Sequence, residues 1–338
     1  MASLTAFRLN FSSALHLGSV RADYDTSETV WHSDSLYAAL TQAWCALGLE
    51  ERLPELLDEQ GQPRHITLSS LYPFATSTAG RLYFFPFPAG ALEAKYMKSH
   101  KKVKKLKYID QDCFLRLQRH GKLQITEDSI YGEYLTTAQG FDPKFIAKKV
   151  FPRARIPRNQ VTSETEIYYM ERIFFAEGSG LYFLAYCENE EAKKRLAALL
   201  EFLGDEGIGT DRHIGNGFFT VEEAEDFDFS QLMVPDSAYR TNLSLFCPED
   251  KTQLQSMLDH QARYKLLKRG GWITTPGFLT YRKQSVYMFR EGGLFRYERP
   301  VGGTTIDLMP KELPDQPSEL NPVYRSGKSL FVPLQSAE

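Results

Sequence analysis

The chain has 338 residues, of which 42% are hydrophobic and 25% are charged, an ordinary composition for a soluble globular protein long enough for two domains. Its formal net charge of −3 argues weakly against nucleic-acid binding, although a single basic face is enough for phosphate contacts. No segment is long and apolar enough to span a bilayer and the N-terminus has no export signal, so we expect a cytoplasmic protein without membrane contact.

The first half of the chain predicts a strand, a helix and a second strand. Hydrophobic residues alternate with polar ones over Thr5–Phe11, which indicates a half-buried strand. A helix is expected to begin with Ser33 as its N-cap and to end before Gly48. Leu82–Phe87 predicts another strand, and the basic stretch at about 89–160 predicts a long insertion with one short helix near residues 110–119.

Further elements follow this insertion. Strands are predicted at Glu171–Glu177 and Gly180–Glu188, joined by a tight hairpin. A helix at Glu190–Leu203, ended by Gly204, precedes a closing strand at Gly217–Glu223. The order strand, helix, two strands, helix, strand is that of a ferredoxin-like domain.

We therefore predict an α+β protein with two ferredoxin-like (RRM-like) domains. The first covers residues 1–235 and contains the insertion at about 89–160 and a glycine-rich loop at 204–217. The second covers residues 236–338, with a strand near Thr241 and a helix opened by Pro248-Glu249-Asp250. The topology of this second domain does not follow from the sequence.

Two basic runs stand out in an otherwise acidic chain. Lys95–Lys107 holds seven lysines and Lys144–Arg158 holds six basic residues, and neither contains an acid. A single run of this kind is typically a solvated surface, whereas two acid-free runs favour an RNA or DNA surface. Tyr96, Tyr108, Tyr168 and Tyr169 lie in or beside the basic segments, where they could stack on unpaired bases or anchor the insertion.

The glycine-rich loop is the most informative stretch of the sequence. Dinucleotide and P-loop motifs need the order strand, glycines, helix, whereas here the glycines follow a helix and precede a strand. The loop can take positive φ angles and approach a bulky partner closely, and it carries Arg212 and His213. The alternative is a long helix-to-strand turn, but five glycines in fourteen residues favour a ligand-facing role.

The sequence is poor in catalytic and metal-binding signals. His16, His32 and His213 are the only reasonable candidates for general acid–base cleavage of RNA, and Asp34 is better explained as structural. No GxSxG, HExxH, HD or GGDD-like motif occurs, and the four cysteines are far apart, without a CxxC pair. We expect no catalytic residue, no metal site and no cofactor.

Several segments together resemble a known family. They are His32–Leu40, Lys104–Ile109, Gly207–Gly217, Gly270–Ile273, Met288–Gly293 and Pro322–Lys328. On these segments the chain is similar to the RAMP superfamily of CRISPR RNA-binding proteins, and within it to the fourth subunit of the type III-A Csm effector complex. The usual Arg-Ser-Ser of RAMP glycine loops is Arg212-His213-Ile214 here.

The resemblance implies a non-catalytic subunit that binds the 5′ handle of the CRISPR RNA (crRNA). It also implies docking between the large cyclase-like subunit and the first RAMP backbone subunit of the Csm complex, in antiviral defence. The residues predicted to bind RNA are His16, His32, Ser33, Lys101, Lys102, Lys104, Lys105, Arg153, Arg155, Arg158, Gly207, Gly209, Arg212, His213, Gly215, Asn216 and Gly217.

Two alternatives remain open. One is a RAMP endoribonuclease that processes precursor crRNA, although those relatives usually carry the glycine loop near the C-terminus and about 120 residues follow it here. The other is a protein scaffold whose basic runs meet an acidic partner.

Overall fold

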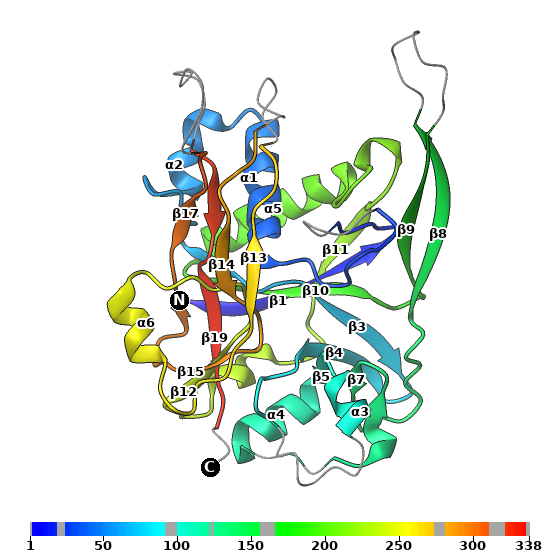
Figure 1. Cartoon of the computed structure of the whole chain (residues 1–338), viewed down its shortest axis with the longest axis vertical. Coiled ribbons are helices and arrows are strands. Elements are labelled where there is room, and N and C mark those ends of the chain that lie inside the picture. Colours follow the sequence, from blue (N-terminus) through cyan, green and yellow to red (C-terminus); the bar gives the residue numbers. More distant parts are fainter. Residues whose placement is uncertain are drawn as a thin grey trace.

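The structure is a computed structural model, and it describes residues 2–18, 24–91, 100–121, 123, 125–155, 166–273, 281–310 and 322–335. It has the mixed α+β architecture that the sequence predicted (Figure 1). None of the helices in these ranges is long and apolar enough to cross a membrane.

The largest sheet has nine strands in the order β11-β1-β10-β3-β4-β5-β7-β6, and β2 also pairs with β10. All neighbouring strands are antiparallel except β5 and β7. The strands are β1 (Ser3–Phe11), β2 (Ile66–Leu68), β3 (Tyr72–Ser77), β4 (Gly80–Pro86), β5 (Tyr108–Asp110), β6 (Ile130–Tyr131), β7 (Tyr134–Leu135), β10 (Gly180–Cys187) and β11 (Phe219–Glu223).

Strand β1 lies between two neighbours and is buried on both faces, so the prediction of a half-buried strand is wrong here. The consecutive residues Phe7, Arg8 and Leu9 are all buried. Arg8 is accommodated because its guanidinium forms ion pairs with Glu222 and Asp226, at 3.2 and 2.9 Å.

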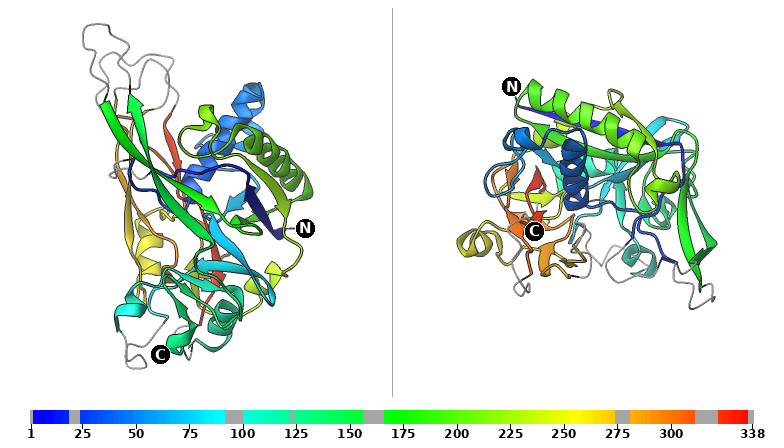
Figure 2. Two further views of the ribbon diagram at one scale, coloured as in Figure 1. Left: turned by 90° about the vertical axis from the view of Figure 1, so that its right-hand side faces the viewer. Right: turned by 90° about the horizontal axis from the view of Figure 1, so that it is seen from above.

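Helices α1 (Ser33–Ala46) and α5 (Glu190–Glu206) lie side by side (Figures 1 and 2) and pack on the sheet. Leucines at helical spacing, such as Leu36 and Leu40 of α1 and Leu196 of α5, join the strand residues Phe7 and Leu9 in one hydrophobic cluster. These two helices are the ones predicted from the sequence.

The predicted helix ends need correction. The N-cap of α1 is His32, because the Ser33 hydroxyl instead accepts a hydrogen bond from the Leu245 backbone N–H. Helix α5 continues through Gly204 and ends at Glu206. A Cβ atom at Gly204 would lie 2.4 Å from the Phe219 carbonyl oxygen, so this glycine permits close packing rather than ending the helix.

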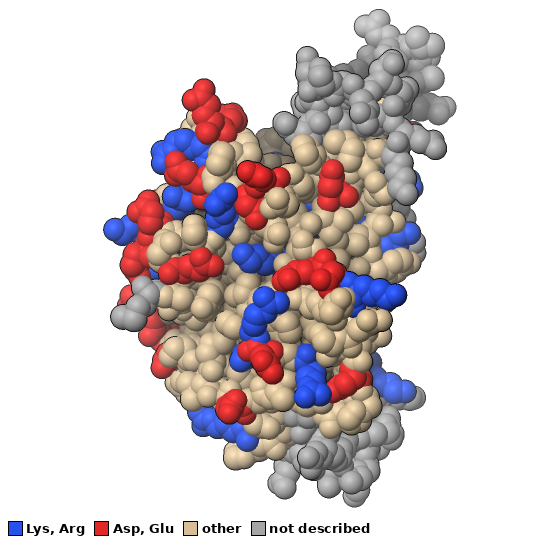
Figure 3. Space-filling view, turned by 90° about the vertical axis from the view of Figure 1, so that its left-hand side faces the viewer, with Lys and Arg blue, Asp and Glu red and all other residues tan. Residues whose placement is uncertain are grey.

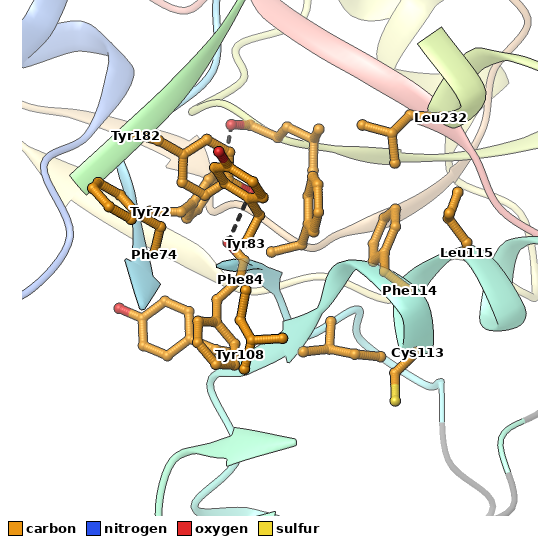
Figure 4. Packing of buried hydrophobic residues seen from close by; sticks show 14 of the residues in the cluster. Tyr72, Phe74, Tyr83, Phe84, Tyr108, Cys113, Phe114, Leu115, Tyr182 and Leu232 are labelled. Carbon is orange, nitrogen blue, oxygen red and sulfur yellow. Dashed lines mark hydrogen bonds between the residues drawn. The ribbon is translucent and has the colours of Figure 1, made fainter. Parts of the chain in front are cut away.

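A second cluster, rich in aromatic residues, joins the two halves of the chain (Figure 4). Tyr72, Phe84 and Tyr182 of the sheet pack there with Phe114 of α4 (Gln111–His120). The same cluster includes Leu243, Leu294, Leu330 and Val332 from beyond the predicted boundary at residue 235. The division into two domains therefore stays a prediction, because both halves share one core.

The predicted insertion is more regular than expected. Its short helix is α4, capped by the Asp110 carboxylate, which accepts a hydrogen bond from the Cys113 N–H. Helix α3 (His100–Lys104) and strands β5, β6 and β7 also lie in it. Strands β8 (Ile146–Arg155) and β9 (Glu166–Phe175) pair along their whole length as a ribbon that extends away from the body (Figure 2).

The hairpin predicted between residues 171–177 and 180–188 is wrong. β9 pairs with β8, whereas β10 pairs with β1, β2 and β3. The turn at Gly178 and Ser179 instead carries the chain from the ribbon into the main sheet. β10 is almost wholly buried, whereas only two residues of β9 are buried, because β10 lies inside the main sheet and β9 lies in the ribbon.

The C-terminal region is built from short strands. Four form an antiparallel sheet in the order β15-β12-β19-β16, and two ribbons pair β13 with β14 and β17 with β18. The remaining bounds are α2 (Leu53–Leu56), β12 (Tyr239–Asn242), α6 (Lys251–Met257), β13 (Leu266–Arg269), β14 (Val286–Phe289), β15 (Leu294–Arg296), β16 (Val301–Gly302), β17 (Thr305–Asp307), β18 (Tyr324–Ser326), β19 (Ser329–Pro333) and the 3₁₀ turns η1 (Glu50–Arg52), η3 (Glu127–Ser129), η4 (Arg212–Ile214) and η5 (Phe229–Met233).

Candidate nucleic-acid interface

A cleft of about 1140 Å³ opens where four separate parts of the chain meet. One wall comes from the segment after β1 and from the first turns of α1. The glycine-rich loop contributes Ile208, Gly209, Thr210 and Arg212, and the region around β13 and β14 forms the opposite side. Helix α1 and Ile208 of the loop are packed in the hydrophobic cluster that contains Phe7 and Leu9, which fixes this side of the cleft.

The cleft is strongly basic. Its acidic lining residues are Glu28 and Asp34, whereas its basic lining residues are Arg212, Lys268, Arg269, Arg282, Lys283, Arg290 and Arg325. Asp34 is bound by two of these arginines, and the other five cations form no ion pair with any carboxylate in the described ranges. Burial and the nearby Arg325 lower the pKa of Lys283, which are effects that an anion in the cleft would oppose.

The Asp34 carboxylate is wholly buried at the edge of this cleft. Arg269 donates to it through Nε and Nη2, at 2.8 and 3.0 Å, and Arg325 donates through Nη1. Burial alone would raise the pKa of Asp34, but the two guanidinium groups outweigh it and hold the pKa well below its usual range. The pairs join α1 to β13 and β18.

A second buried pair lies beside the first. His32 Nδ1 is 2.7 Å from Glu291 Oε1, and the Ser70 hydroxyl also donates to that carboxylate oxygen. Burial alone would raise the pKa of Glu291. The nearby His32 and the hydrogen bonds to the carboxylate lower it by more, so that its pKa lies below the usual value. His32 and Ser33 thus contact Glu291 and Leu245 in the C-terminal half of the chain.

The glycine-rich loop is folded tightly against itself and against the segment after β1. The Thr210 N–H donates to the His16 carbonyl at 3.0 Å, and the Gly217 N–H donates to the Ala14 carbonyl at 2.8 Å. A Cβ atom at Gly209 would lie 2.4 Å from the His16 carbonyl oxygen, and one at Gly217 would lie 1.9 Å from the Ile208 carbonyl oxygen. These two glycines are required by close approach as well as by their positive φ.

The C-terminal part of the chain, residues 235–334, matches the family model described as the CRISPR Csm4 C-terminal domain. The "CRISPR system Cms protein Csm4" of Thermococcus onnurineus (strain NA1) is 29% identical over 288 residues, covering 82% of this chain and 85% of the relative. The protein of the same name from Methanocaldococcus jannaschii is 23% identical over 377 residues, covering 98% of this chain and 97% of the relative. Over most of its length the chain is therefore similar to Csm4 proteins.

Solved structures related to Csm4 have a similar fold. A chain of the Csm3-Csm4 subcomplex in the type III-A CRISPR-Cas interference complex superposes with a TM-score of 0.60 and 20% identity, covering 98% of this chain and 99% of the other. A chain of the Csm1-Csm4 cassette in complex with pppApA gives a TM-score of 0.59 with 20% identity and full coverage of both chains. At this level of identity the likeness concerns the fold.

Some residues that the sequence predicted to bind RNA line the cleft. His16, His32, Gly209 and Arg212 are among its lining residues. The His16 ring is buried, with Nδ1 2.7 Å from the Glu171 carbonyl oxygen. Arg212 is exposed and directed to solvent, which makes it the predicted residue best placed to reach a ligand.

Other predicted residues lie outside the cleft. Within the loop these are Gly207, His213, Gly215, Asn216 and Gly217, and Ser33 is buried behind the helix start. Exposed lysines Lys102, Lys104 and Lys105 lie on and after α3 (Figure 1), where Lys102 pairs with Glu127 at 2.9 Å. Arg153 of β8 pairs with Asp211 of the loop at 3.3 Å.

A few predicted positions cannot be placed. Arg158 and Tyr96 lie outside the described residues, as do the side chains of Lys101 and Arg155. Of the tyrosines considered for base stacking, Tyr108 is buried in the core, whereas Tyr169 is exposed on the ribbon.

The sequence interpretation missed the basic residues that the C-terminal half of the chain contributes to the cleft. Lys268, Arg282, Lys283 and Arg290 are spread over more than twenty positions and form no run. The available signal was the family resemblance at Gly270–Ile273, because Gly270, Gly271 and Trp272 also line the cleft. Among the residues that the structure describes, no three His, Cys, Asp or Glu side chains gather as metal ligands would.

Proposed function

We propose that this chain is the subunit of a cytoplasmic type III-A CRISPR effector complex that binds the 5′ handle of the crRNA in the basic cleft. The observation that carries the proposal is the convergence on one cleft of Arg212 from the glycine-rich loop and unpaired cations from the β13–β14 region. A constant single-stranded tag suits such a site, because lysine and arginine neutralise its phosphates while loop amides and side chains read its unpaired bases.

The proposed partners follow from the related structures. Csm4 chains occur there with Csm3 in one assembly and with Csm1 in another. By analogy, this chain bridges the large cyclase-like subunit and the first RAMP backbone subunit. The topology supports a ferredoxin-like first unit, because β11, β1, β10 and β2 are adjacent and antiparallel, with α1 and α5 as the crossovers.

The proposal includes the absence of catalysis. The endoribonuclease alternative needs a histidine free to exchange protons with RNA. His16 and His32 are hydrogen-bonded inside the protein, at 2.7 Å each, and His213 is exposed outside the cleft. These contacts favour binding without cleavage.

The test is the affinity of the full chain for a fluorescent RNA that carries the host's repeat-derived 5′ handle, measured by anisotropy in metal-free buffer. We expect the handle RNA to bind more tightly than an RNA with a scrambled handle, and to remain intact. Arg212→Ala should weaken handle binding by about 1–3 kcal/mol, because a charge-assisted contact is lost. His213→Ala, the adjacent exposed residue outside the cleft, serves as the matched control and should change little.

Equal affinity for both RNAs would contradict handle recognition, and cleavage of the RNA would favour the processing nuclease. The scaffold alternative makes a different prediction for charge reversal at Lys101, Lys102, Lys104 and Lys105. It requires loss of subunit association with unchanged RNA affinity, whereas phosphate contacts at these lysines would lower affinity for any RNA and reduce its salt dependence.

A further inference from the structure

Trp272 is an exposed indole in the wall of the basic cleft. Half of it, 51%, is accessible to solvent, whereas Trp44 is 3% exposed. An indole is among the largest apolar surfaces that a residue can bury, so leaving it in water forgoes a substantial stabilisation. Proteins that bind single-stranded nucleic acid present aromatic side chains beside cations, so that unpaired bases stack on them.

The backbone around Trp272 is fixed by a short pairing with the chain that returns after it. Trp272 and Arg282 face each other as a β-bridge, and the Ile273 N–H donates to the Tyr281 carbonyl at 2.9 Å. The Lys283 N–H donates to the Gly271 carbonyl at 2.9 Å, and the Ile273 side chain is buried. The indole is therefore presented from an anchored strand.

The indole is also oriented by a cation. The Arg282 guanidinium carbon lies 4.6 Å from the centroid of the Trp272 ring, within the range of a cation–π contact. Gly271 precedes Trp272, and a Cβ atom at Gly271 would have no neighbour within 4 Å beyond its own chain neighbours, so the backbone before the indole is open. The pair thus forms a flat platform that is preorganised and accessible.

The neighbours of this platform suit a nucleotide. Lys268, Lys283 and Arg290 line the same cleft and supply charge for phosphates, while the aromatic platform supplies a surface for a base. A hydrophobic protein segment would instead find cations and glycines around the ring. We infer that Trp272, backed by Arg282, is the stacking platform for one unpaired nucleobase of the RNA strand in the cleft, an inference that rests on the proposed function.

The test compares Trp272→Ala with Trp272→Phe, which retains an aromatic face. Handle-RNA affinity should fall about 5- to 100-fold for Trp272→Ala, as expected for the loss of one base–aromatic stack, and much less for Trp272→Phe. Tyr287→Ala is the matched control. Tyr287 lies on β14 and is 62% exposed, and the Lys268 Nζ atom is 5.8 Å from the centroid of its ring. It does not line the cleft. Its removal should leave the affinity unchanged.

Two further readouts separate stacking from a structural role. The slope of log affinity against log salt should be the same for Trp272→Ala and the wild type, because no phosphate contact is removed. With 2-aminopurine placed in turn at each handle position, one position should be quenched on binding to the wild type and not to Trp272→Ala. Melting temperatures of the variants verify that folding is intact.

Unchanged affinity and unchanged 2-aminopurine signals in Trp272→Ala, while Arg212→Ala still weakens binding, would overturn the platform and leave the proposed function standing. If Trp272→Ala retained RNA binding but lost association with a partner subunit, the indole would be a protein contact and the inference would be wrong. No binding of handle RNA by the wild type would overturn both the platform and the proposed function.

Discussion

Asp34 shows at the scale of one residue how the cleft is held together. Its carboxylate accepts hydrogen bonds from Arg269 and Arg325, which lie 235 and 291 positions further along the chain. The sequence indicated that Asp34 is structural rather than a metal ligand, and these contacts agree with that interpretation. The partners could not be predicted, because an isolated arginine in a sequence carries no sign of which distant carboxylate it meets.

Asp34→Asn should destabilise the folded chain by about 3–5 kcal/mol, because Arg269 and Arg325 would stay partly buried without their countercharge. The measurement is the free energy of unfolding by denaturant at neutral pH. Glu127→Gln breaks the exposed pair with Lys102 and is the matched control, expected to cost at most about 1 kcal/mol. A loss no larger for Asp34→Asn than for Glu127→Gln would contradict this account.

The stability lost in Asp34→Asn should depend on pH in a defined direction. The pKa of Asp34 is lower in the folded chain than in the unfolded one, so its stabilisation is present above the unfolded value of about 4 and is lost as the pH falls towards the folded pKa. Glu291, whose pKa is also lowered, makes the stability of the wild type and of the variant fall on acidification in the same way, so it does not contribute to their difference. The stability difference between wild type and Asp34→Asn should therefore narrow on acidification below about pH 4.

At the scale of elements, the glycine-rich loop was predicted from the sequence, but the packing of its individual glycines was not. The sequence predicted the loop and its possible contact with a ligand. It did not reveal that Gly209 and Gly217 are packed against backbone carbonyls while Gly215 has open space around it. This difference depends on where the loop folds back, which five similar glycines in a sequence do not encode.

Gly217→Ala should disturb the loop far more than Gly215→Ala. Both residues have positive φ, of 78° and 88°, so alanine at either position costs about 1–2 kcal/mol of backbone strain. Only at Gly217 would the new Cβ atom collide with the Ile208 carbonyl oxygen. Melting temperature and handle-RNA affinity should both fall clearly further for Gly217→Ala, and equal effects of the two substitutions would contradict the packing described.

The other elements divide in a similar way. Helices α1, α4 and α5 were predictable, because hydrophobic spacing and capping residues are local signals. The β8–β9 ribbon was missed, since β8 carries Pro152 and lysines among its apolar residues and shows no clean alternation. β9 pairs with β8 and not with β10 because of packing between distant segments. The local sequence at Gly178 is typical of a tight turn and therefore predicted a β9–β10 hairpin.

At the scale of the whole molecule, the candidate site is an assembly of distant segments. The sequence led to a run of lysines, of which the structure describes Lys102, Lys104 and Lys105 on and after α3, outside the cleft, with Lys102 paired with Glu127. The cleft instead collects single cations from β13 to β14, together with Arg212. Family resemblance identified segments at this site, but composition could not, because dispersed charges become a basic surface only after folding.

The face shown in Figure 3 carries basic and acidic side chains interspersed, in keeping with the small net charge of the chain. Attraction of RNA, as proposed, would depend on a local concentration of positive charge, and the cleft has such a concentration. The buried pairs of Asp34 and Glu291 join the two halves of the chain beside that cleft. The basic cleft and the buried ion pairs that hold the two halves together thus lie in one region of the molecule.

The most direct test of this account is ultraviolet cross-linking of the complex purified from its native cells, followed by mass spectrometry of the peptides attached to RNA. We predict that nucleotides of the constant 5′ handle cross-link to peptides that contain Arg212, Trp272 or Lys283. Handle nucleotides cross-linked only to other parts of this chain, or only to other subunits, would contradict the cleft as the site of crRNA binding.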